Sequence, residues 1–357
     1  MNFTKKSVSR GRLFFFLVLI LCSVGCREQP PAQASQTPHA ASPPTPEIRG
    51  TSTPEPPPTL DCELRPSGVS LTLPWDGGRL YRSYSYIHMG SRENRCEIPV
   101  EGRTALDEGP PDGVVVHYLA QKAGQPDVRA HVEIPKRALP PLSNPELEIR
   151  KLDYTLTVLD NGRPVKRYPV ALGGDPEKRK FCQDMKSTPE GWYEVYNLQP
   201  DATYFKALDL DYPRPIDTVR HQLAIQRGVI EATRPIGGEI QIHGWGIAGN
   251  WTAGCIALRD EDMTEIFNDP AIRPGLPVFI TGSQVSESDR PWLRAPSAES
   301  VAAVQTVLKE SGLYQGAVDG QFGNGTALAL GRYQVRHGLP DSCQLDRTTR
   351  RHFQLEE

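Results

Sequence analysis

The spacing of apolar residues limits the fold of this chain more than any other feature, because the spacing changes along the sequence. Between residues 61 and 281, short runs alternate apolar and polar positions, which predicts strands with one buried face. Such runs are Val69-Leu71-Leu73, Val114-Val116-Tyr118 and Leu152-Tyr154-Leu156-Val158. Beyond residue 297 the spacing lengthens to three or four residues, which predicts helices. One uniform domain is therefore excluded, and a length of 357 residues favours two or three domains.

The β-like part is predicted to contain two units. Residues 61–146 indicate a small β-rich module, broken by Gly and Pro, in which no chemistry is apparent. Residues 148–281 are more regular, because Asp160-Asn161-Gly162 supplies a hairpin turn between two alternating runs. In this second unit only Asp260–Phe267 has helical spacing. We therefore expect a mostly β domain with one short helix after Cys255.

The last 60 residues are predicted to form a compact unit of three helices, residues 297–355. Its expected boundaries are a stop at Gly312, a cap at Thr326, a stop at Gly338 and a start at Asp346. A unit of this size has a small core, which is more typical of a docking module than of an enzyme.

The beginning of the chain is typical of an exported protein. Residues 1–25 combine a basic start with the apolar run Leu13–Leu21, which is too short to span a membrane but suits a signal peptide. Cys26 follows and resembles the lipidation site of bacterial lipoproteins, so we expect a lipid-anchored protein of the cell envelope or periplasm. Simple cleavage and an uncleaved anchor are the alternatives. Residues 26–60 are rich in proline, with ten between residues 27 and 60, and predict an extended linker.

The net charge bears on the class of binding partner, and the predicted export bears on the redox state of the cysteines. The net charge of −3 gives no electrostatic reason to expect a nucleic-acid partner. Export implies an oxidising compartment, so Cys62 and Cys96 are expected to form a disulfide. The pairing of Cys182 and Cys343, with each other or with another thiol, stays open.

Two glycine-flanked residues carry the candidate chemistry. His243 ends an apolar run in Ile242-His243-Gly244, and Cys255 follows in Thr252-Ala253-Gly254-Cys255. A free thiol has a pKa near 8.5 and needs help to ionise at neutral pH, which an adjacent imidazole provides. The N-terminus of a following helix would favour the thiolate, and the backbone N–H groups of Gly254 and Cys255 would bind an oxyanion.

A structural role or a zinc site would also account for a histidine and a cysteine in these positions. Taken singly, a buried cysteine or a hydrogen-bonded core histidine is more often structural. A zinc site needs further ligands, and no other His or Cys lies nearby at ligand spacing, so we expect neither a metal nor a cofactor. The glycines beside both residues favour catalysis, because they let a substrate approach the backbone closely.

Residues 148–281 resemble the YkuD-type L,D-transpeptidase catalytic domain. The matching motifs are Ile242-His243-Gly244, Thr252-Ala253-Gly254-Cys255, Lys186-Ser187-Thr188-Pro189-Glu190-Gly191, and Tyr212-Pro213 with Asp217. The resemblance implies a β-sandwich in which Cys255 is the nucleophile and His243 its general base. It also implies that the Gly244 carbonyl orients the imidazole, that Thr252 lines the donor site, and that Tyr212 and Gly254 belong to the substrate or oxyanion site.

The chain departs from that family at two positions. Ala253 stands where the family often has His, and Ala257 stands where it often has Arg, so the resemblance does not define the acyl acceptor. Arg259 is expected to face solvent from the helix that follows the nucleophile.

The C-terminal unit resembles the three-helix peptidoglycan-binding domain of cell-wall enzymes. The matching segments are Val304-Gln305, Gly312 to Gly316, Val318 to Gly320, Phe322-Gly323, Thr326, Tyr333-Gln334 and Gly338-Leu339. Together the two resemblances imply peptidoglycan stem peptides and glycan as partners, with a stem amine or a wall-attached protein as acyl acceptor. A hydrolase on the same scaffold and a catalytically inert wall-binding lipoprotein are the alternative functions.

Overall fold

The computed structural model describes residues 57–66, 68–84 and 95–355. The predicted signal peptide (1–25), Cys26 and all of the linker up to residue 56 lie outside these residues and stay predictions. Within the described ranges, no helix combines the length and the apolar character needed to cross a bilayer.

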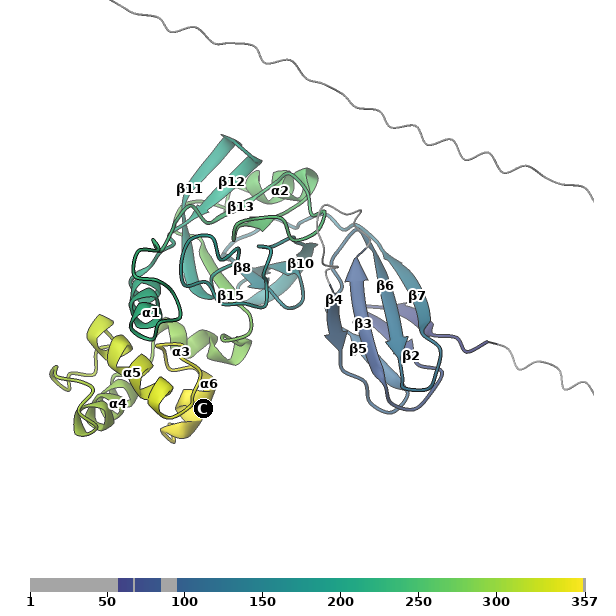
Figure 1. Cartoon of the computed structure of the whole chain (residues 1–357). Coiled ribbons are helices and arrows are strands. Elements are labelled where there is room, and N and C mark those ends of the chain that lie inside the picture. The colour runs from purple at the N-terminus through teal and green to yellow at the C-terminus, as the bar shows by residue number, and fades with distance from the viewer. Residues whose placement is uncertain (1–56, 67, 85–94, 356–357) are drawn as a thin grey trace, which may run out of the picture. The chain divides into compact units, whose positions relative to one another are not determined.

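The N-terminal module consists of two antiparallel sheets, as the alternating runs predict. One sheet has the order β1-β2-β5 and the other the order β4-β3-β6-β7 (Figure 1). The strands are β1 (Asp61–Arg65), β2 (Gly68–Thr72), β3 (Arg79–Tyr84), β4 (Arg95–Ile98), β5 (Thr104–Asp107), β6 (Val114–Gln121) and β7 (Val128–Ile134). Leu71, Leu80 and Val116 are fully buried, so the inward positions of the alternating runs form the core.

The expected disulfide between Cys62 and Cys96 is wrong in this structure, because both residues are free thiols. Cys62 lies on β1 and Cys96 on β4, which belong to different sheets. Burial raises the pKa of Cys62 to about 11 and that of Cys96 to about 12, so both remain protonated near neutral pH.

The central domain is built on one eight-stranded sheet with the order β10-β9-β8-β15-β11-β12-β13-β14. Its strands are β8 (Pro145–Arg150), β9 (Thr155–Asp160), β10 (Arg163–Pro169), β11 (Gly191–Ala202), β12 (Phe205–Leu210), β13 (Gln241–His243), β14 (Ile256–Ala257) and β15 (Pro277–Thr281). The long strand β11 joins two halves, since Gly191–Glu194 pair with β15 while Val195–Ala202 pair with β12. The mostly β fold class is confirmed.

The predicted hairpin is formed by β9 and β10. Asp160 pairs with Arg163, and the two residues between them, Asn161 and Gly162, both have positive φ angles (49° and 75°). Two positive φ angles are what the tightest hairpin turns require, which is why Asn-Gly signals this turn in a sequence.

The prediction of a single helix in this domain is wrong. The expected helix is α2 (Asp260–Phe267), but α1 (Pro215–Gln226) is longer and lies between β12 and β13 in the chain. Its buried face includes the charged residues Asp217 and Arg220 beside Val219 and Leu223, so it has no continuous apolar stripe. Proline at its first position, with Asp217 bonding back to the Arg214 N–H, is the start signal that the sequence offered.

The C-terminal unit has the predicted three helices, α4 (Ala298–Glu310), α5 (Asn324–Arg336) and α6 (Arg347–His352). A short turn, η1 (Glu287–Asp289), and α3 (Arg290–Arg294) precede them. Asp346 caps α6 as expected, but Gly323 occupies the cap of α5 that was predicted for Thr326. Thr326 is instead buried and hydrogen-bonds through its hydroxyl to Gln305, which ties α5 to α4.

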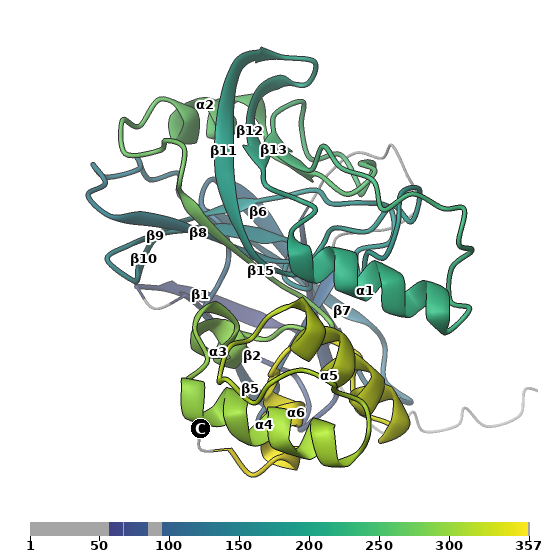
Figure 2. The same ribbon diagram turned by 90° about the vertical axis from the view of Figure 1, so that its left-hand side faces the viewer.

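Helix α1 also packs against the C-terminal unit. Val219 and Leu223 of α1 share an apolar cluster with Ala327 of α5 and with Cys343, and Figure 2 shows α1 beside α5. The guanidinium of Arg220 donates to the backbone oxygen of Ser342 at 2.9 Å. Cys182 and Cys343 are both buried free thiols, so they do not pair.

Candidate active site

The two candidate catalytic residues lie on neighbouring strands. His243 is the last residue of β13, and Cys255 directly precedes β14. The two strands run parallel with Ile242 opposite Ile256, so Cys255 lies beside Gln241, two residues before His243. The chain folds back between them, as the glycines of that loop predicted.

The imidazole of His243 is held in one tautomer. His243 is 1% exposed, and its Nδ1 lies 2.7 Å from the carbonyl oxygen of Gly244, so Nδ1 carries the proton and donates it. The other nitrogen, Nε2, is then the unprotonated one. Burial lowers the pKa of His243, while the bond to Gly244 opposes this shift. A neutral imidazole with a free Nε2 lone pair is the form that a general base requires.

The thiol of Cys255 is in its protonated resting state. Burial raises its pKa, whereas the backbone N–H of Gln241 and the ammonium of Lys180 lower it. Its Sγ lies 3.4 Å from the carbonyl oxygen of Glu239, to which it donates. The thiol is therefore not bonded to the imidazole here, which is common in free enzymes whose catalytic hydrogen bonds tighten only with substrate.

The expectation that a helix N-terminus favours the thiolate is wrong. After Cys255 the chain enters β14, and α2 begins only at Asp260. The first turn of α2 is acidic, and Asp260 accepts the backbone N–H of Trp245 at 2.6 Å. Stabilisation of the thiolate therefore falls to the Gln241 N–H and to Lys180.

Thr252 and Gly254 have a different arrangement from the predicted one. The Thr252 hydroxyl donates to the backbone oxygen of Cys255 at 2.8 Å and accepts the N–H of Gly254 at 3.1 Å. Thr252 is buried, so it shapes the turn before the nucleophile and does not line an open donor site. The Gly254 N–H is occupied by this bond and is not free to bind an oxyanion in this conformation.

Neither Gly244 nor Gly254 has room for a side chain. A Cβ on Gly244 would lie 2.6 Å from a carboxylate oxygen of Asp260. A Cβ on Gly254 would lie 2.6 Å from the backbone oxygen of Ser187, and Gly254 also has a φ of +134°, which L side chains rarely adopt. The predicted importance of both glycines thus has a local steric cause.

The Lys186–Gly191 motif supports the nucleophile turn. Its Ser187 carbonyl leaves no room for a Cβ on Gly254, and its Glu190 forms a buried ion pair with Lys151, with 2.8 Å between Nζ and Oε1. Burial alone would raise the pKa of Glu190, but the Lys151 ammonium outweighs that effect and holds the pKa below its ordinary value. Because Lys151 lies in the connection between β8 and β9, this ion pair holds the motif against that hairpin.

Tyr212 lies at the edge of this site. It is buried, and its hydroxyl donates to the backbone oxygen of Ile236 at 3.2 Å. The ring of Tyr212 has the ammonium of Lys180 above it, 5.8 Å from the ring centre. The hydroxyl of Tyr212 is thus bonded to the backbone, and its ring is the part that lies beside Lys180.

An aromatic wall surrounds His243, and the sequence did not predict it. Tyr204 stacks on the imidazole with 5.1 Å between ring centres, and Trp251 meets it edge-on at 5.5 Å. Trp245, which is 65% exposed, packs against both aromatic residues. Tyr204 comes from the β11–β12 turn, about 40 residues before His243, so no local pattern could have revealed the wall.

Arg259 does not face solvent, contrary to expectation. Its guanidinium bonds Asp262 in the next turn and donates to the backbone oxygen of Gly113 at 2.8 Å. Arg259 therefore connects the central domain to the N-terminal module and supplies no charge to the nucleophile.

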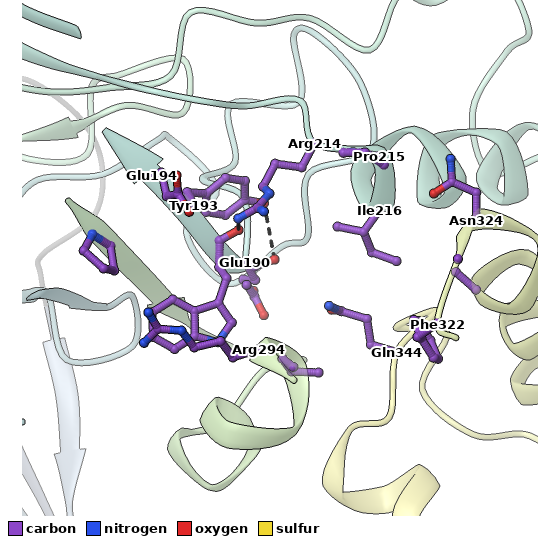
Figure 3. Close-up of a pocket in the computed structure, with 16 residues that line it drawn as sticks. Glu190, Tyr193, Glu194, Arg214, Pro215, Ile216, Arg294, Phe322, Asn324 and Gln344 are labelled. Atoms are coloured by element: carbon purple, nitrogen blue, oxygen red, sulfur yellow. Dashed lines mark hydrogen bonds between the residues drawn. The ribbon is translucent and has the colours of Figure 1, made fainter. Parts of the chain in front are cut away.

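A well-formed cavity lies apart from these residues. It has a volume of about 390 Å³ and lies between β11, α1, α3 and the start of α5 (Figure 3). Arg214, Arg294, Phe322 and Gln344 border it, whereas Cys255 and His243 do not. The part of the chain with described coordinates contains no group of three His, Cys, Asp or Glu residues that could hold a metal ion.

The site thus combines a neutral histidine of fixed tautomer with a protonated cysteine directly before the neighbouring strand. Comparison with protein families gives the class. Residues 144–280 match the family model YkuD, the L,D-transpeptidase catalytic domain, and residues 297–352 match the model of a peptidoglycan binding domain. The chain thus carries an L,D-transpeptidase catalytic domain followed by a peptidoglycan-binding domain.

Individual relatives match over shorter stretches. The spore cortex-lytic enzyme of Bacillus cereus is 39% identical over 70 residues, which cover 18% of this chain and 27% of that protein. The chain therefore spans about a quarter of the length of the curated relatives it matches.

Among solved structures, L,D-transpeptidases from several organisms are similar to this chain. The enzyme from Xylanimonas cellulosilytica (residues 123–326) is 17% identical with a TM-score of 0.26, covering 41% of this chain and 64% of that one. L,D-transpeptidase 1 from Mycobacterium tuberculosis is 15% identical with a TM-score of 0.25, covering 56% and 86%.

Proposed function

We propose that this protein is a peptidoglycan L,D-transpeptidase that forms a thioester between Cys255 and a tetrapeptide stem. The observation that carries the proposal is the pairing of β13 with β14 inside an L,D-transpeptidase catalytic domain. This pairing brings a buried imidazole with a free Nε2 next to the strand position of the thiol.

In the proposed acylation step, the thiol turns from Glu239 towards His243. Nε2 takes the thiol proton while sulfur attacks the carbonyl carbon of the third stem residue. A sulfur–carbon bond forms, the carbon–nitrogen bond to the terminal D-amino acid breaks, and His243 returns the proton to the departing amine. The Gly244 carbonyl stabilises the transient imidazolium, as an acidic partner does in other triads.

In the second step an amine attacks the thioester carbon. His243 again accepts a proton, now from the amine, and the thiol is released with its proton restored. Water in place of the amine would make the protein a hydrolase. The C-terminal domain supports a wall-bound substrate, since residues 297–352 match a peptidoglycan binding domain.

The proposal includes export to the cell envelope, with a lipid on Cys26 as the anchor and the proline-rich segment as the tether. Labelling cells with an alkyne fatty acid, with Cys26→Ala as the control, tests the anchor. Loss of label in the variant supports it, and equal label in both proteins contradicts it.

The reaction is tested by incubating the purified protein with disaccharide-tetrapeptide and identifying products by mass spectrometry, with Cys255→Ala as the control. We expect dimers linked through two third-position residues, absent with the variant. Tripeptide alone would establish the hydrolase instead. Unchanged substrate with the wild-type protein, and also with an amine-bearing wall protein supplied, would leave a binding role and overturn the proposal.

A further inference from the structure

Three lysines of the central domain have buried side chains, and two of them are fully paired. The ammonium of Lys151 donates to Glu190 at 2.8 Å, to the backbone oxygen of Thr188 at 2.8 Å and to that of Lys178 at 3.1 Å. The ammonium of Lys166 pairs with Glu265 and donates to the backbone oxygen of Arg137. Such partners are the ordinary condition for burying a charge.

Lys180 is the exception among these three. It is 7% exposed, yet no carboxylate of the described residues lies within ion-pair distance, and its ammonium makes no hydrogen bond to them. Its nearest polar surroundings are those of the reaction site. Nζ would lie 3.4 Å from a Cβ placed on Gly254, directly before the nucleophile, and it sits above the Tyr212 ring.

The electrostatics around Lys180 favour the approach of an anion. Burial lowers the pKa of Lys180, and interactions with Cys255, Cys182 and Asp184 only partly oppose the shift. The carboxylates that act on the neighbouring thiol are Glu239 and Asp209, and Asp209 accepts hydrogen bonds from the side chains of Asn197, Gln199 and Gln241. Within the described part of the chain, an anion arriving beside the thiol would therefore meet the unpaired ammonium of Lys180.

The proposed substrate supplies an anion at the right place. In a tetrapeptide stem, the residue that leaves carries the free terminal carboxylate, three covalent bonds from the carbon that sulfur attacks. Consecutive residues are about 3.8 Å apart, so this carboxylate must lie within one residue length of the nucleophile. A cation against Gly254 lies at that range.

We propose that the ammonium of Lys180 binds the terminal carboxylate of the departing D-amino acid, which makes the site select stems that end one residue after the cleaved bond. This inference rests on the proposed function. It makes Lys180 a substrate-binding and specificity-determining residue for which neither the motifs nor the domain matches account.

The first test compares donor substrates with a free acid and with a carboxamide at the same terminus. For Lys180→Met we expect kcat/KM for the acid to fall roughly 10- to 100-fold, mainly through KM, because a hydrogen-bonded ion pair is lost. Turnover of the carboxamide should change less than about threefold, since it never made that ion pair. Lys180→Arg should recover part of the loss, and Lys178→Met, an exposed lysine of the same segment, should match the wild type.

The second test needs no turnover. Iodoacetate carries a carboxylate and iodoacetamide does not, so the ratio of their rates at Cys255, read by peptide mass spectrometry, reports a nearby cation. We expect Lys180→Met to lower this ratio by about threefold or more, because focused charge raises the local concentration of an opposite charge. Urea unfolding verifies that the variant is folded.

The outcomes separate the two ideas. Wild-type protein without peptide turnover but with a ratio that falls in Lys180→Met would reject the proposed function and keep the carboxylate site. An unchanged ratio would overturn the Lys180 proposal whatever the turnover. Equal losses on acid and carboxamide, with the pH profile of iodoacetamide labelling moved to higher pH, would show that Lys180 acts only through the thiolate and not on the substrate carboxylate, which also overturns the proposal.

Discussion

Residues 179–190 contribute to two buried polar clusters that differ in how fully they are paired. In the first cluster Lys151, Glu190, Asp217 and Arg220 bond to one another or to backbone oxygens, and Arg220 reaches the C-terminal unit. In the second cluster Lys180, His243 and Cys255 share few bonds, and His243 keeps a nitrogen free. The difference teaches that burial of a charged side chain does not by itself distinguish a structural residue from a reactive one. The two kinds of residue differ in how many of their hydrogen-bonding positions are paired.

The unpaired cluster is tested first through its base, where we expect the largest effect. His243→Gln keeps a polar side chain but removes the proton acceptor, so kcat/KM should fall about 10³- to 10⁴-fold, as for triad members in other enzymes. Product formation from disaccharide-tetrapeptide measures this loss. A fall of less than tenfold would mean that another group takes the thiol proton.

The two buried lysines should differ in what they contribute to stability. Lys151→Met leaves Glu190 buried without its partner, so the free energy of unfolding should drop by about 3–5 kcal/mol. Lys180→Met removes a cation that has no carboxylate partner among the described residues, so its change should stay within about 1 kcal/mol. Urea denaturation of both variants measures the difference. Equal losses in the free energy of unfolding would contradict the distinction between the two clusters.

Gly254 lies between the Lys186–Gly191 motif and the unpaired cluster, because a Cβ placed on it would contact both Ser187 and Lys180. Gly254→Ala should destabilise the protein by roughly 1–3 kcal/mol, since it forces a side chain into a positive φ and against the Ser187 carbonyl. Thermal unfolding gives the cost. Gly246→Ala is the matched control for positive φ alone, because a Cβ there meets no atom within 4 Å. Equal losses at both positions would show that the contact with Ser187 is unimportant.

The ion pair of the first cluster should also make the free energy of unfolding depend on pH in the acid range. This is the smallest effect that we expect. Lys151 holds the pKa of Glu190 below its ordinary value, so the unfolded chain takes up the proton first as the pH falls. Stability that is present at neutral pH is therefore lost progressively below about pH 4.5, through the folded-state pKa. Glu190→Gln should have a flatter profile by urea unfolding from pH 6 to 3, and parallel profiles would contradict this.

Local chemistry explains which features were predictable. Asn161-Gly162 predicts its own turn, because two adjacent positive φ angles suit few other residue pairs. His243, Gly244, Gly254 and Cys255 are recognisable because their neighbours in sequence are also their neighbours in space. Helix α1 was missed because its inward face carries Asp217 and Arg220, which pair with each other and also bond to Tyr193 and Ser342 far away in the chain.

The sequence by itself determined the change from strands to helices and the β-rich class of both N-terminal units, and it supplied the pair of residues proposed to carry the reaction. Only the tertiary structure decided how that pair is surrounded. It placed Tyr204 on the imidazole, turned the Gly254 N–H towards Thr252, kept Cys62 and Cys96 apart, and set Lys180 against the nucleophile turn without a carboxylate partner in the described chain. The reason is that hydrophobic period and turn chemistry act over a few residues, whereas the state of a buried polar group depends on which distant atoms reach it.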